Sequence, residues 1–344
     1  MKTRTLSMQP MIVGLAILLG IFPLAWPQET PSFKVEVDLV NILATVRDKQ
    51  GRLVNSLTKE DFLLEEEGQP QEIEYFSSET DLPLTLGLLV DTSMSQSRIL
   101  EEERQASYQF LADILRPESD LAFVMSFDIE AQLLENLTHS QEQLLAALDS
   151  LQVPTRPGRA GVGTVLYDSV FLAVDEILKF ESGRKAMIVI SDGVDFGSIM
   201  DLDQAIEAAQ RNDSIIYTVR YYDSEMNMAL RGRSGGGGRA GSGGRGGRRG
   251  PGGGRGGAPR RPQLPDGKQI LERLARETGG SMFEVTEEQS LEEIFQKIEE
   301  ELRHQYSIGY TPNRESSQKA FRTIRLTTRK GLTVRCREGY YISS

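Results

Sequence analysis

Residues 84–95 read Leu-Thr-Leu-Gly-Leu-Leu-Val-Asp-Thr-Ser-Met-Ser, and this stretch decides the fold. Residues 84–90 form a nearly continuous apolar run that ends at Asp91, which is typical of a strand buried on both faces of a parallel sheet. The polar segment after the run then lies at the carboxyl end of a strand, where open α/β sheets bind ligands. Similar apolar runs recur at 121–127, 186–190 and 215–219.

Between and after these runs, apolar residues recur at the spacing of helices that bury one face. The helical stretches are expected at 99–115, 166–179, 202–209, 268–278 and 291–302. Strands that alternate with helices over roughly 200 residues predict an α/β fold with a doubly wound, mostly parallel sheet. We place this domain at residues 82–304.

The segments on either side of this domain have the alternating pattern of β-strands. Residues 32–80 read as a small all-β unit. In residues 305–344 the alternation resumes around a turn at Lys330-Gly331, which predicts a β-hairpin. Neither piece has enough strands for a stable sheet of its own. We therefore expect a smaller β-sandwich formed from the N- and C-terminal segments together.

The N-terminus has the pattern of a signal peptide, which we assign to residues 1–28. Lys2 and Arg4 precede an apolar run from Met11 to Trp26, and Pro27-Gln-Glu29 follows it. We expect export to the periplasm, the cell surface or the medium, with no integral membrane span after cleavage. The alternative is an uncleaved membrane anchor.

The charge of the chain is unevenly distributed. The formal net charge is −11, although residues 231–261 contain nine arginines and no acidic residue, which leaves −20 for the rest. This acidity argues against nucleic acid as the main partner of the folded part. The segment 231–262 consists mainly of glycine and arginine, with some Ser, Ala and Pro, and cannot bury a core, so we expect a disordered loop.

Carboxylates and hydroxyls follow the predicted strands at the edge where ligands bind. Asp91, Ser93 and Ser95 follow the first run, and Ser191-Asp192-Gly193 follows the run that ends at Ile190. Between them, the loop Gly161-Val-Gly-Thr164 opens a helix. Mg²⁺ binds oxygen ligands and keeps several waters, so two carboxylates and three hydroxyls suit it. The predicted metal ligands are Asp91, Ser93, Ser95, Thr164 and Asp192, with Mn²⁺ or Ca²⁺ as alternatives to Mg²⁺.

A simpler interpretation of these residues stays open. In it, Asp91 and Asp192 only cap their loops, and the hydroxyls satisfy backbone groups. Two further acids lie close to the set in sequence. Asp168 is interpreted either as a helix-surface acid or as a support for the site, and Asp195 either orients a water molecule or is simply exposed.

The combination of Asp91-x-Ser93-x-Ser95, a distant Thr164 and Ser191-Asp-Gly193 resembles the metal-ion-dependent adhesion site (MIDAS) of von Willebrand factor A domains. The wider chain resembles a bacterial family of von Willebrand factor A-related proteins best known from acidobacteria. The stretches that carry this resemblance are Phe33-Lys-Val-Glu-Val37, Leu57-Thr-Lys-Glu-Asp-Phe62, Thr164-Val-Leu-Tyr-Asp168, Arg303-His-Gln-Tyr-Ser-Ile-Gly-Tyr310 and Glu338-Gly-Tyr-Tyr341.

The resemblance implies a role for each residue of the site. Asp91, Ser93 and Ser95 would be direct or near-direct ligands, Thr164 would join when a partner is bound, and Asp192 would act largely through water. Members of the family usually have glycine at the position of Met94, so the methionine in this chain makes the loop bulkier.

These observations favour a binding protein over an enzyme. The sequence contains no Gly-x-Ser-x-Gly elbow, no P-loop lysine motif and no His-Glu-x-x-His. We expect an exported, adhesion-type module whose metal receives an acidic residue of a protein partner. The alternatives are a metal-independent scaffold of the cell envelope and a binder of anionic polymers that acts through the Gly/Arg-rich loop.

Overall fold

The computed structural model describes residues 39–78, 82–96, 99–152, 163–221, 266–312 and 320–342. The predicted signal peptide, the stretch Phe33–Val37, the Gly/Arg-rich loop and the first two residues of the loop Gly161–Thr164 lie outside the described residues.

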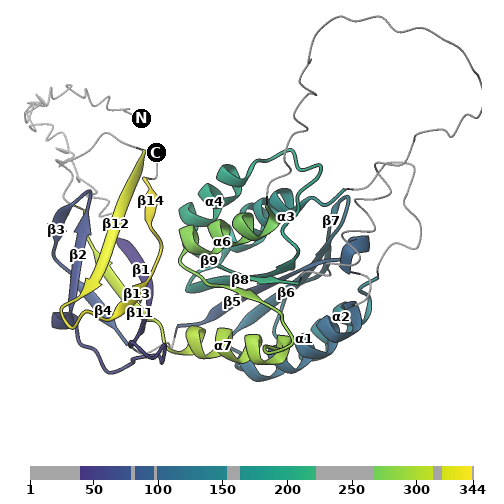
Figure 1. Ribbon diagram of the computed structural model, residues 1–344, viewed down its shortest axis with the longest axis horizontal. Helices are drawn as coiled ribbons and strands as arrows, with labels where there is room; N and C mark the ends of the chain where they lie inside the picture. The colour runs from purple at the N-terminus through teal and green to yellow at the C-terminus, as the bar shows by residue number, and fades with distance from the viewer. Residues whose placement is uncertain are drawn as a thin grey trace, which may run out of the picture. The chain divides into compact units, whose positions relative to one another are not determined.

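A six-stranded sheet forms the centre of the α/β domain (Figure 1). The strand order is β10-β9-β8-β5-β6-β7, and every neighbouring pair is parallel except β6 and β7. Strand β5 is the predicted apolar run, and all of its residues are buried. The strands are β5 (Leu84–Asp91), β6 (Leu121–Phe127), β7 (Ala131–Thr138), β8 (Arg184–Ser191), β9 (Ser214–Arg220) and β10 (Met282–Glu284).

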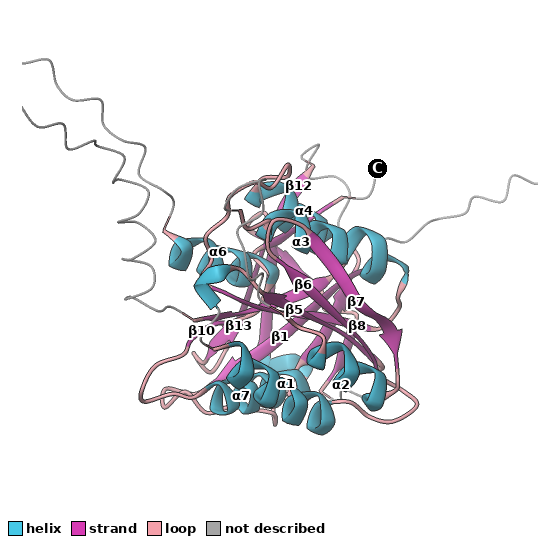
Figure 2. Cartoon of the chain, turned by 90° about the vertical axis from the view of Figure 1, so that its right-hand side faces the viewer, coloured by secondary structure: helices cyan, strands magenta, loops and turns pink. Residues whose placement is uncertain are grey.

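Helices lie on both faces of this sheet (Figure 2). Helices α1, α2 and α7 pack on one face and helices α3, α4 and α6 on the other. The predicted α/β class with a doubly wound, mostly parallel sheet is therefore confirmed. The helices are α1 (Leu100–Ile114), α2 (Gln141–Asp149), α3 (Leu166–Leu172), α4 (Leu202–Arg211), α6 (Gly267–Thr278) and α7 (Leu291–Arg303), and α3 continues into a π-helical turn, η3 (Ala173–Ile177), and a 3-10 turn, η4 (Leu178–Phe180).

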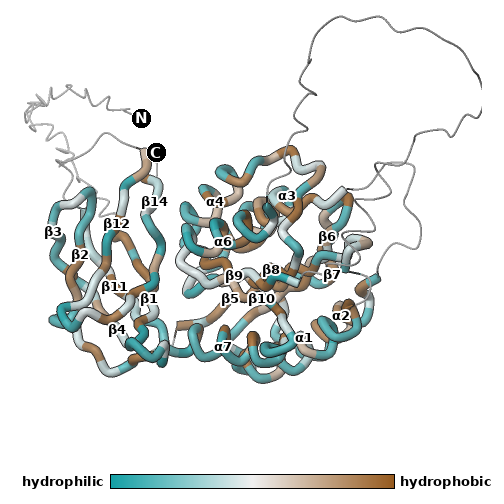
Figure 3. Tube along the Cα trace, in the orientation of Figure 1, coloured by the Kyte–Doolittle hydropathy of each residue, from teal (hydrophilic) through white to brown (hydrophobic). Residues whose placement is uncertain are grey.

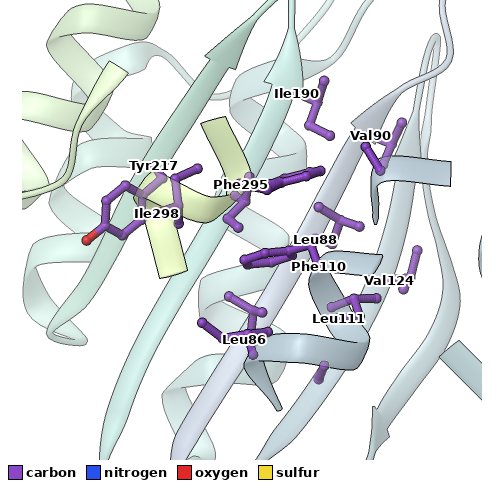
Figure 4. Packing of buried hydrophobic residues seen from close by; sticks show 14 of the residues in the cluster. Leu86, Leu88, Val90, Phe110, Leu111, Val124, Ile190, Tyr217, Phe295 and Ile298 are labelled. Atoms are coloured by element: carbon purple, nitrogen blue, oxygen red, sulfur yellow. The ribbon is translucent and has the colours of Figure 1, made fainter. Parts of the chain in front are cut away.

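The core between the sheet and α1 and α7 shows why these segments become strands and helices. Leu86, Leu88 and Val90 of β5 point to this face, because alternate residues of a strand share one side (Figure 4). The rings of Phe110 and Phe295 stack above them, with centroids 4.6 Å apart. The central strands are the most hydrophobic part of the domain, and polar residues gather on the outer surface of the helices (Figure 3).

The strands outside the α/β domain form two antiparallel four-stranded sheets around one shared core. The first has the order β13-β1-β11-β4 and the second β14-β12-β2-β3. Each sheet combines strands from both ends of the described chain. The strands are β1 (Val40–Arg47), β2 (Phe62–Glu66), β3 (Gln69–Gln71), β4 (Tyr75–Ser77), β11 (Tyr306–Tyr310), β12 (Phe321–Thr328), β13 (Thr333–Arg335) and β14 (Gly339–Tyr341).

The C-terminal hairpin predicted around Lys330-Gly331 does not form. Strand β12 pairs with β2 and β14, whereas β13 pairs with β1 in the other sheet. The alternating pattern specifies which face of a strand is buried but not its partner. Both strands contribute residues to the same core, and the turn between them crosses from one sheet to the other. The boundaries that the sequence predicts for the signal peptide, the α/β domain and the two β segments remain predictions.

Three helices or strands of the α/β domain, α2, β7 and the edge strand β10, were not predicted from the sequence. Helix α2 and the antiparallel edge strand β7 follow β6, and β7 has no fully buried residue. Across the ranges that the structure describes, no helix is both long enough and apolar enough to cross a membrane.

Candidate metal centre

The loop after β5 brings three of the predicted ligands together. Asp91 is the last residue of β5 and is completely buried. The backbone N–H of Ser93 donates to Oδ1 of Asp91 at 2.9 Å, and the hydroxyls of Ser93 and Ser95 lie 2.8 Å apart. A 3-10 turn, η2 (Met94–Gln96), tightens the loop. The Met94 side chain is exposed, so its bulk does not fill the buried space around Asp91.

The end of β8 joins this loop from the neighbouring strand. Val90 pairs with Ile190, which places Ser191 beside Asp91. The Ser191 hydroxyl donates to Oδ2 of Asp91 at 2.7 Å and accepts a bond of 3.0 Å from the N–H of Gly193. Asp192 follows directly and is also buried, and its Oδ1 accepts a 2.9 Å bond from the N–H of Val194.

Gly193 fixes the path of the chain after Asp192. Its φ is +82°, in the left-handed region that glycine adopts at little cost. A Cβ at this position would lie 2.2 Å from the carbonyl oxygen of Gly267, the first residue of α6. Only glycine therefore lets the loop after β8 pass this closely over the start of α6.

Thr164 is held in place by backbone contacts with the same loop. It exchanges two backbone hydrogen bonds with Phe196, of 3.1 and 2.8 Å, and the N–H of Val165 donates to the carbonyl of Asp128 at 2.8 Å. The Thr164 side chain is buried. Among the described residues, no hydrogen bond joins its hydroxyl to the other four predicted ligands, and its backbone bonds go to Phe196, in the loop that follows Asp192.

Asp168 and Asp195 both shape the loop 192–201. The carboxylate of Asp168 accepts hydrogen bonds from the N–H groups of Ile199 and Met200, with distances of 2.8 to 3.0 Å. The carboxylate of Asp195 accepts bonds from the Ser198 hydroxyl and the Tyr167 N–H. The two acids thus tie the loop to the first turn of α3, and neither is simply an exposed surface acid.

The electrostatics of the centre follow from its burial. Burial and, after it, the nearby charge of Asp192 raise the pKa of Asp91 to about 7, against the lowering effect of the hydrogen bonds from Ser191 and Ser93. A buried carboxylate with this pKa lacks a compensating positive charge. A bound cation would provide that charge.

Glu103 of α1 lies behind the centre. Its side chain is buried, and neither carboxyl oxygen has a hydrogen-bond partner in the part of the chain that the structure describes. Burial raises its pKa well above the usual value, and the charges of Asp91 and Glu102 add to the effect. Burial and these neighbouring charges therefore favour the protonated, neutral form of Glu103 over the charged one.

Sequence reasoning included Ser191 in the motif after β8 but gave it no role, and it did not assign Glu103 to this centre. The role of Ser191 depends on the register between β5 and β8, which the sequence does not reveal. Glu103 had a visible signal, because it interrupts the buried stripe formed by Leu100, Ala106 and Phe110 on α1. A charged residue in such a stripe is rare unless the surroundings neutralise it.

The donor set fits a hard cation that binds oxygen. All five predicted ligands offer carboxylate or hydroxyl oxygens, which suits Mg²⁺, Mn²⁺ or Ca²⁺ better than a softer metal. Among the described residues, no three His, Cys, Asp or Glu side chains gather closely enough to hold a metal by themselves. A metal at this centre would therefore need oxygen ligands besides carboxylates, and the predicted set offers the hydroxyls of Ser93, Ser95 and Thr164.

Comparison with known proteins gives matches among solved structures only; no family model and no curated protein matches the chain. An aerotolerance-related membrane protein from Bacteroides fragilis is 15% identical, with a TM-score of 0.42, and the match covers 64% of this chain and 98% of that one. The SpRpn10 VWA domain is 13% identical, with a TM-score of 0.40, over 63% of this chain and 95% of that domain.

A third similar structure contains a metal. It is the proximal thread matrix protein 1 from the mussel byssus with a zinc-occupied MIDAS motif, 13% identical with a TM-score of 0.44. The match covers 69% of this chain and 49% of that protein. At TM-scores of 0.40 to 0.44, these three matches carry no argument about the metal, the partner or the cellular location of this chain.

Proposed function

We propose that this chain is an exported binding protein whose α/β domain holds a divalent cation and thereby captures an acidic residue of a protein partner. Asp91, Ser93, Ser95, Thr164 and Asp192 would hold the cation, with Mg²⁺ preferred. The export is proposed from the N-terminal sequence. The observation that carries the proposal is the buried, uncompensated carboxylate of Asp91, held between two hydroxyl-bearing loops.

The hydrogen bonds of Asp91 leave it free to bind a cation. Oδ1 accepts from the Ser93 N–H, and Oδ2 accepts from the Ser191 hydroxyl. A carboxylate offers roughly four lone-pair positions. One bond on each oxygen fixes the orientation of the group and leaves lone pairs on both oxygens for a metal.

The hydroxyls limit the negative charge of the site. Ser93, Ser95 and Thr164 contribute oxygens without charge, so Asp91 and Asp192 are the only proposed ligands that carry one. When bound, a divalent cation supplies an electrophilic centre with a coordination position that a partner carboxylate can fill. The raised pKa of the buried Glu103 near Asp91 favours its neutral form, which adds no charge to this balance.

Calorimetric titration of metal-free protein with Mg²⁺, Mn²⁺ and Ca²⁺ tests the proposal. We expect saturable binding at one site, weakened more than about 100-fold by Asp91→Asn. That substitution preserves the shape of the side chain while removing its charge. Asp175→Asn is the matched control, because Asp175 forms a surface ion pair with Lys179 on the turn after α3.

The result also separates the proposal from its alternatives. If the metals neither bind nor raise the melting temperature, the metal-dependent function is wrong and the scaffold function is favoured. A binder of anionic polymers would instead lose its affinity when residues 231–261 are deleted, and that affinity would fall steeply with added salt.

A further inference from the structure

Four large apolar side chains are exposed on the loops at the carboxyl ends of the parallel strands. Met94 follows β5, Ile129 follows β6, and Phe196 and Ile199 follow β8. Between 41% and 90% of each residue is exposed to solvent. We call these four residues the apolar rim. They lie on the same edge of the sheet as the candidate metal centre.

Three residues of the rim are tied to the proposed ligands. Met94 lies between Ser93 and Ser95 in the chain. Phe196 exchanges two backbone hydrogen bonds with Thr164. A Cβ on the preceding Gly163 would lie 2.9 Å from the carbonyl oxygen of Phe196 and 3.3 Å from Cγ2 of Ile129. Glycine at 163 therefore allows the loops that carry Ile129 and Phe196 to come close to the residue that precedes Thr164.

Ile199 is the most exposed residue of the rim, and its backbone is fixed. Its N–H donates to both oxygens of Asp168 at 3.0 Å. The side chain is 90% exposed even though the loop beneath it is anchored. Apolar side chains held in solvent by a structured loop are typical of an interaction surface.

The charges near the rim restrict what it can bind. Asp128 and Glu130 flank Ile129 in the chain, and Asp195 precedes Phe196. These three acids would repel further carboxylates on a ligand. The surface therefore suits a ligand that brings one acid to the centre and apolar groups to the rim.

We infer that the partner is a protein segment in which a single acidic residue is flanked by large apolar side chains. This inference rests on the proposed function, because the acidic residue is the one that the metal would receive. The rim adds specificity, because burying its apolar side chains is favourable when the residues beside the acid on the partner are also apolar.

Three labelled peptides test the inference against the full chain in Mg²⁺ and in chelator, by fluorescence polarisation. Their sequences are Gly-Leu-Phe-Glu-Leu-Gly, Gly-Ser-Ser-Glu-Ser-Gly and Gly-Leu-Phe-Gln-Leu-Gly. We expect the first to bind in Mg²⁺ at least about tenfold more tightly than the second. The third, which lacks the acid, should bind more weakly than the first and show no dependence on Mg²⁺.

A double variant, Ile129→Ser with Ile199→Ser, examines the rim itself. We expect it to bind the first two peptides with equal affinity. The matched control is Leu172→Ser with Phe180→Ser, because these two residues are also exposed but lie at the end of α3 and in η4. The control variant should keep the preference for apolar flanks. Titration of each variant with Mg²⁺ shows whether its metal site is intact.

The outcomes distinguish the inference from the function beneath it. If the chain binds Mg²⁺ but takes both Glu peptides equally, or takes neither, the inference is overturned and the metal site stands. A preference that survives in the Ile129/Ile199 variant also overturns it. If the chain binds no metal, the proposed function fails, and the partner inferred from it fails too.

Discussion

The hydroxyl of Ser191 donates a 2.7 Å hydrogen bond to Oδ2 of Asp91, although the two residues are 100 positions apart in the chain. They meet because β5 and β8 are adjacent parallel strands that end at the same level (Figure 1). The same hydroxyl accepts from the N–H of Gly193 and so links Asp91 to the turn beyond Asp192.

Replacing Ser191 tests how far this bond orients Asp91. We expect Ser191→Ala to weaken Mg²⁺ binding by about 10- to 100-fold, because residues that orient a ligand contribute on this scale. Calorimetry measures the change. The control is Ser307→Ala, which removes a buried hydroxyl bonded to Asn41 in the β-sandwich. Equal affinity in the two variants would show that Asp91 is oriented without Ser191.

The second prediction concerns Gly193, which lies very close to Gly267. Gly193→Ala should lower the free energy of unfolding by about 2–4 kcal/mol, because it combines backbone strain at positive φ with a clash against a carbonyl oxygen. Gly51→Ala is the matched control. Gly51 has a similar φ of +80°, but no atom lies within 4 Å of its added Cβ. The difference between the two variants in urea unfolding isolates the clash.

The raised pKa of the buried Glu103 should make the stability of the fold depend on pH. Its folded-state pKa is raised, so the folded chain keeps the proton at pH values where the unfolded chain releases it. The stabilisation from the neutral acid is complete below the unfolded value of 4.5 and is lost as the pH rises through the folded pKa. Relative to Glu103→Gln, the wild type should lose about 1.4 kcal/mol of stability per pH unit above pH 4.5.

Urea unfolding of the wild type and Glu103→Gln across this pH range measures the effect. The exposed neighbour Glu102 provides the control, Glu102→Gln, which we expect to track the wild type. Parallel stability curves for the wild type and Glu103→Gln would mean that Glu103 is ionised in the folded chain.

The parts of the fold that the sequence predicts are those in which burial leaves a clear pattern. Strand β5 is buried along its whole length, so its apolar run is unmistakable. Strand β7 mixes half-buried and exposed residues without regular alternation, because it pairs with β6 through two register shifts at the edge of the sheet. Its sequence accordingly carries no clear strand signal.

The same reasoning applies to the candidate site. Asp91, Ser93 and Ser95 are close in the sequence, so their proximity follows from one loop. Ser191 could not be assigned because its contact depends on register. The two strands of the predicted C-terminal hairpin lie in different sheets for a related reason. Strand β12 pairs with β2 and strand β13 pairs with β1, and these partners are up to nearly 300 residues away in the sequence. Strand patterns do not encode such partners.

A buried ion pair holds the core of the β-sandwich. Glu66 accepts hydrogen bonds of 2.6 Å from both Arg322 and Tyr310, and one of 3.1 Å from Tyr340. Both charged side chains are almost completely buried. Glu66→Ala should therefore cost about 3–5 kcal/mol, because it removes the carboxylate of a buried ion pair and the three hydrogen bonds that this carboxylate accepts.

Thermal unfolding followed by circular dichroism checks this prediction. Glu65→Ala is the control on the same strand, where Glu65 forms only a loose surface pair with Arg325 at 3.8 Å. We expect a change of about 0–1 kcal/mol there. A similar loss for both variants would show that the buried network adds nothing beyond the surface pair.

The pairing of β1 with β11 and β13 has a consequence for how the chain acquires its structure. A chain that emerges from its N-terminus presents β1 long before β11 and β13 exist, and β2 with only its neighbour β3 as a partner until β12 is made. The α/β domain between them can close its own sheet first, because all of its strands lie within one continuous stretch. Because the sandwich can close only after a long loop has been ordered, we expect its closure to come last and to be slow. Until then, the edges of β1 and β2 stay open to aggregation, which makes these strands the natural client of a holding chaperone.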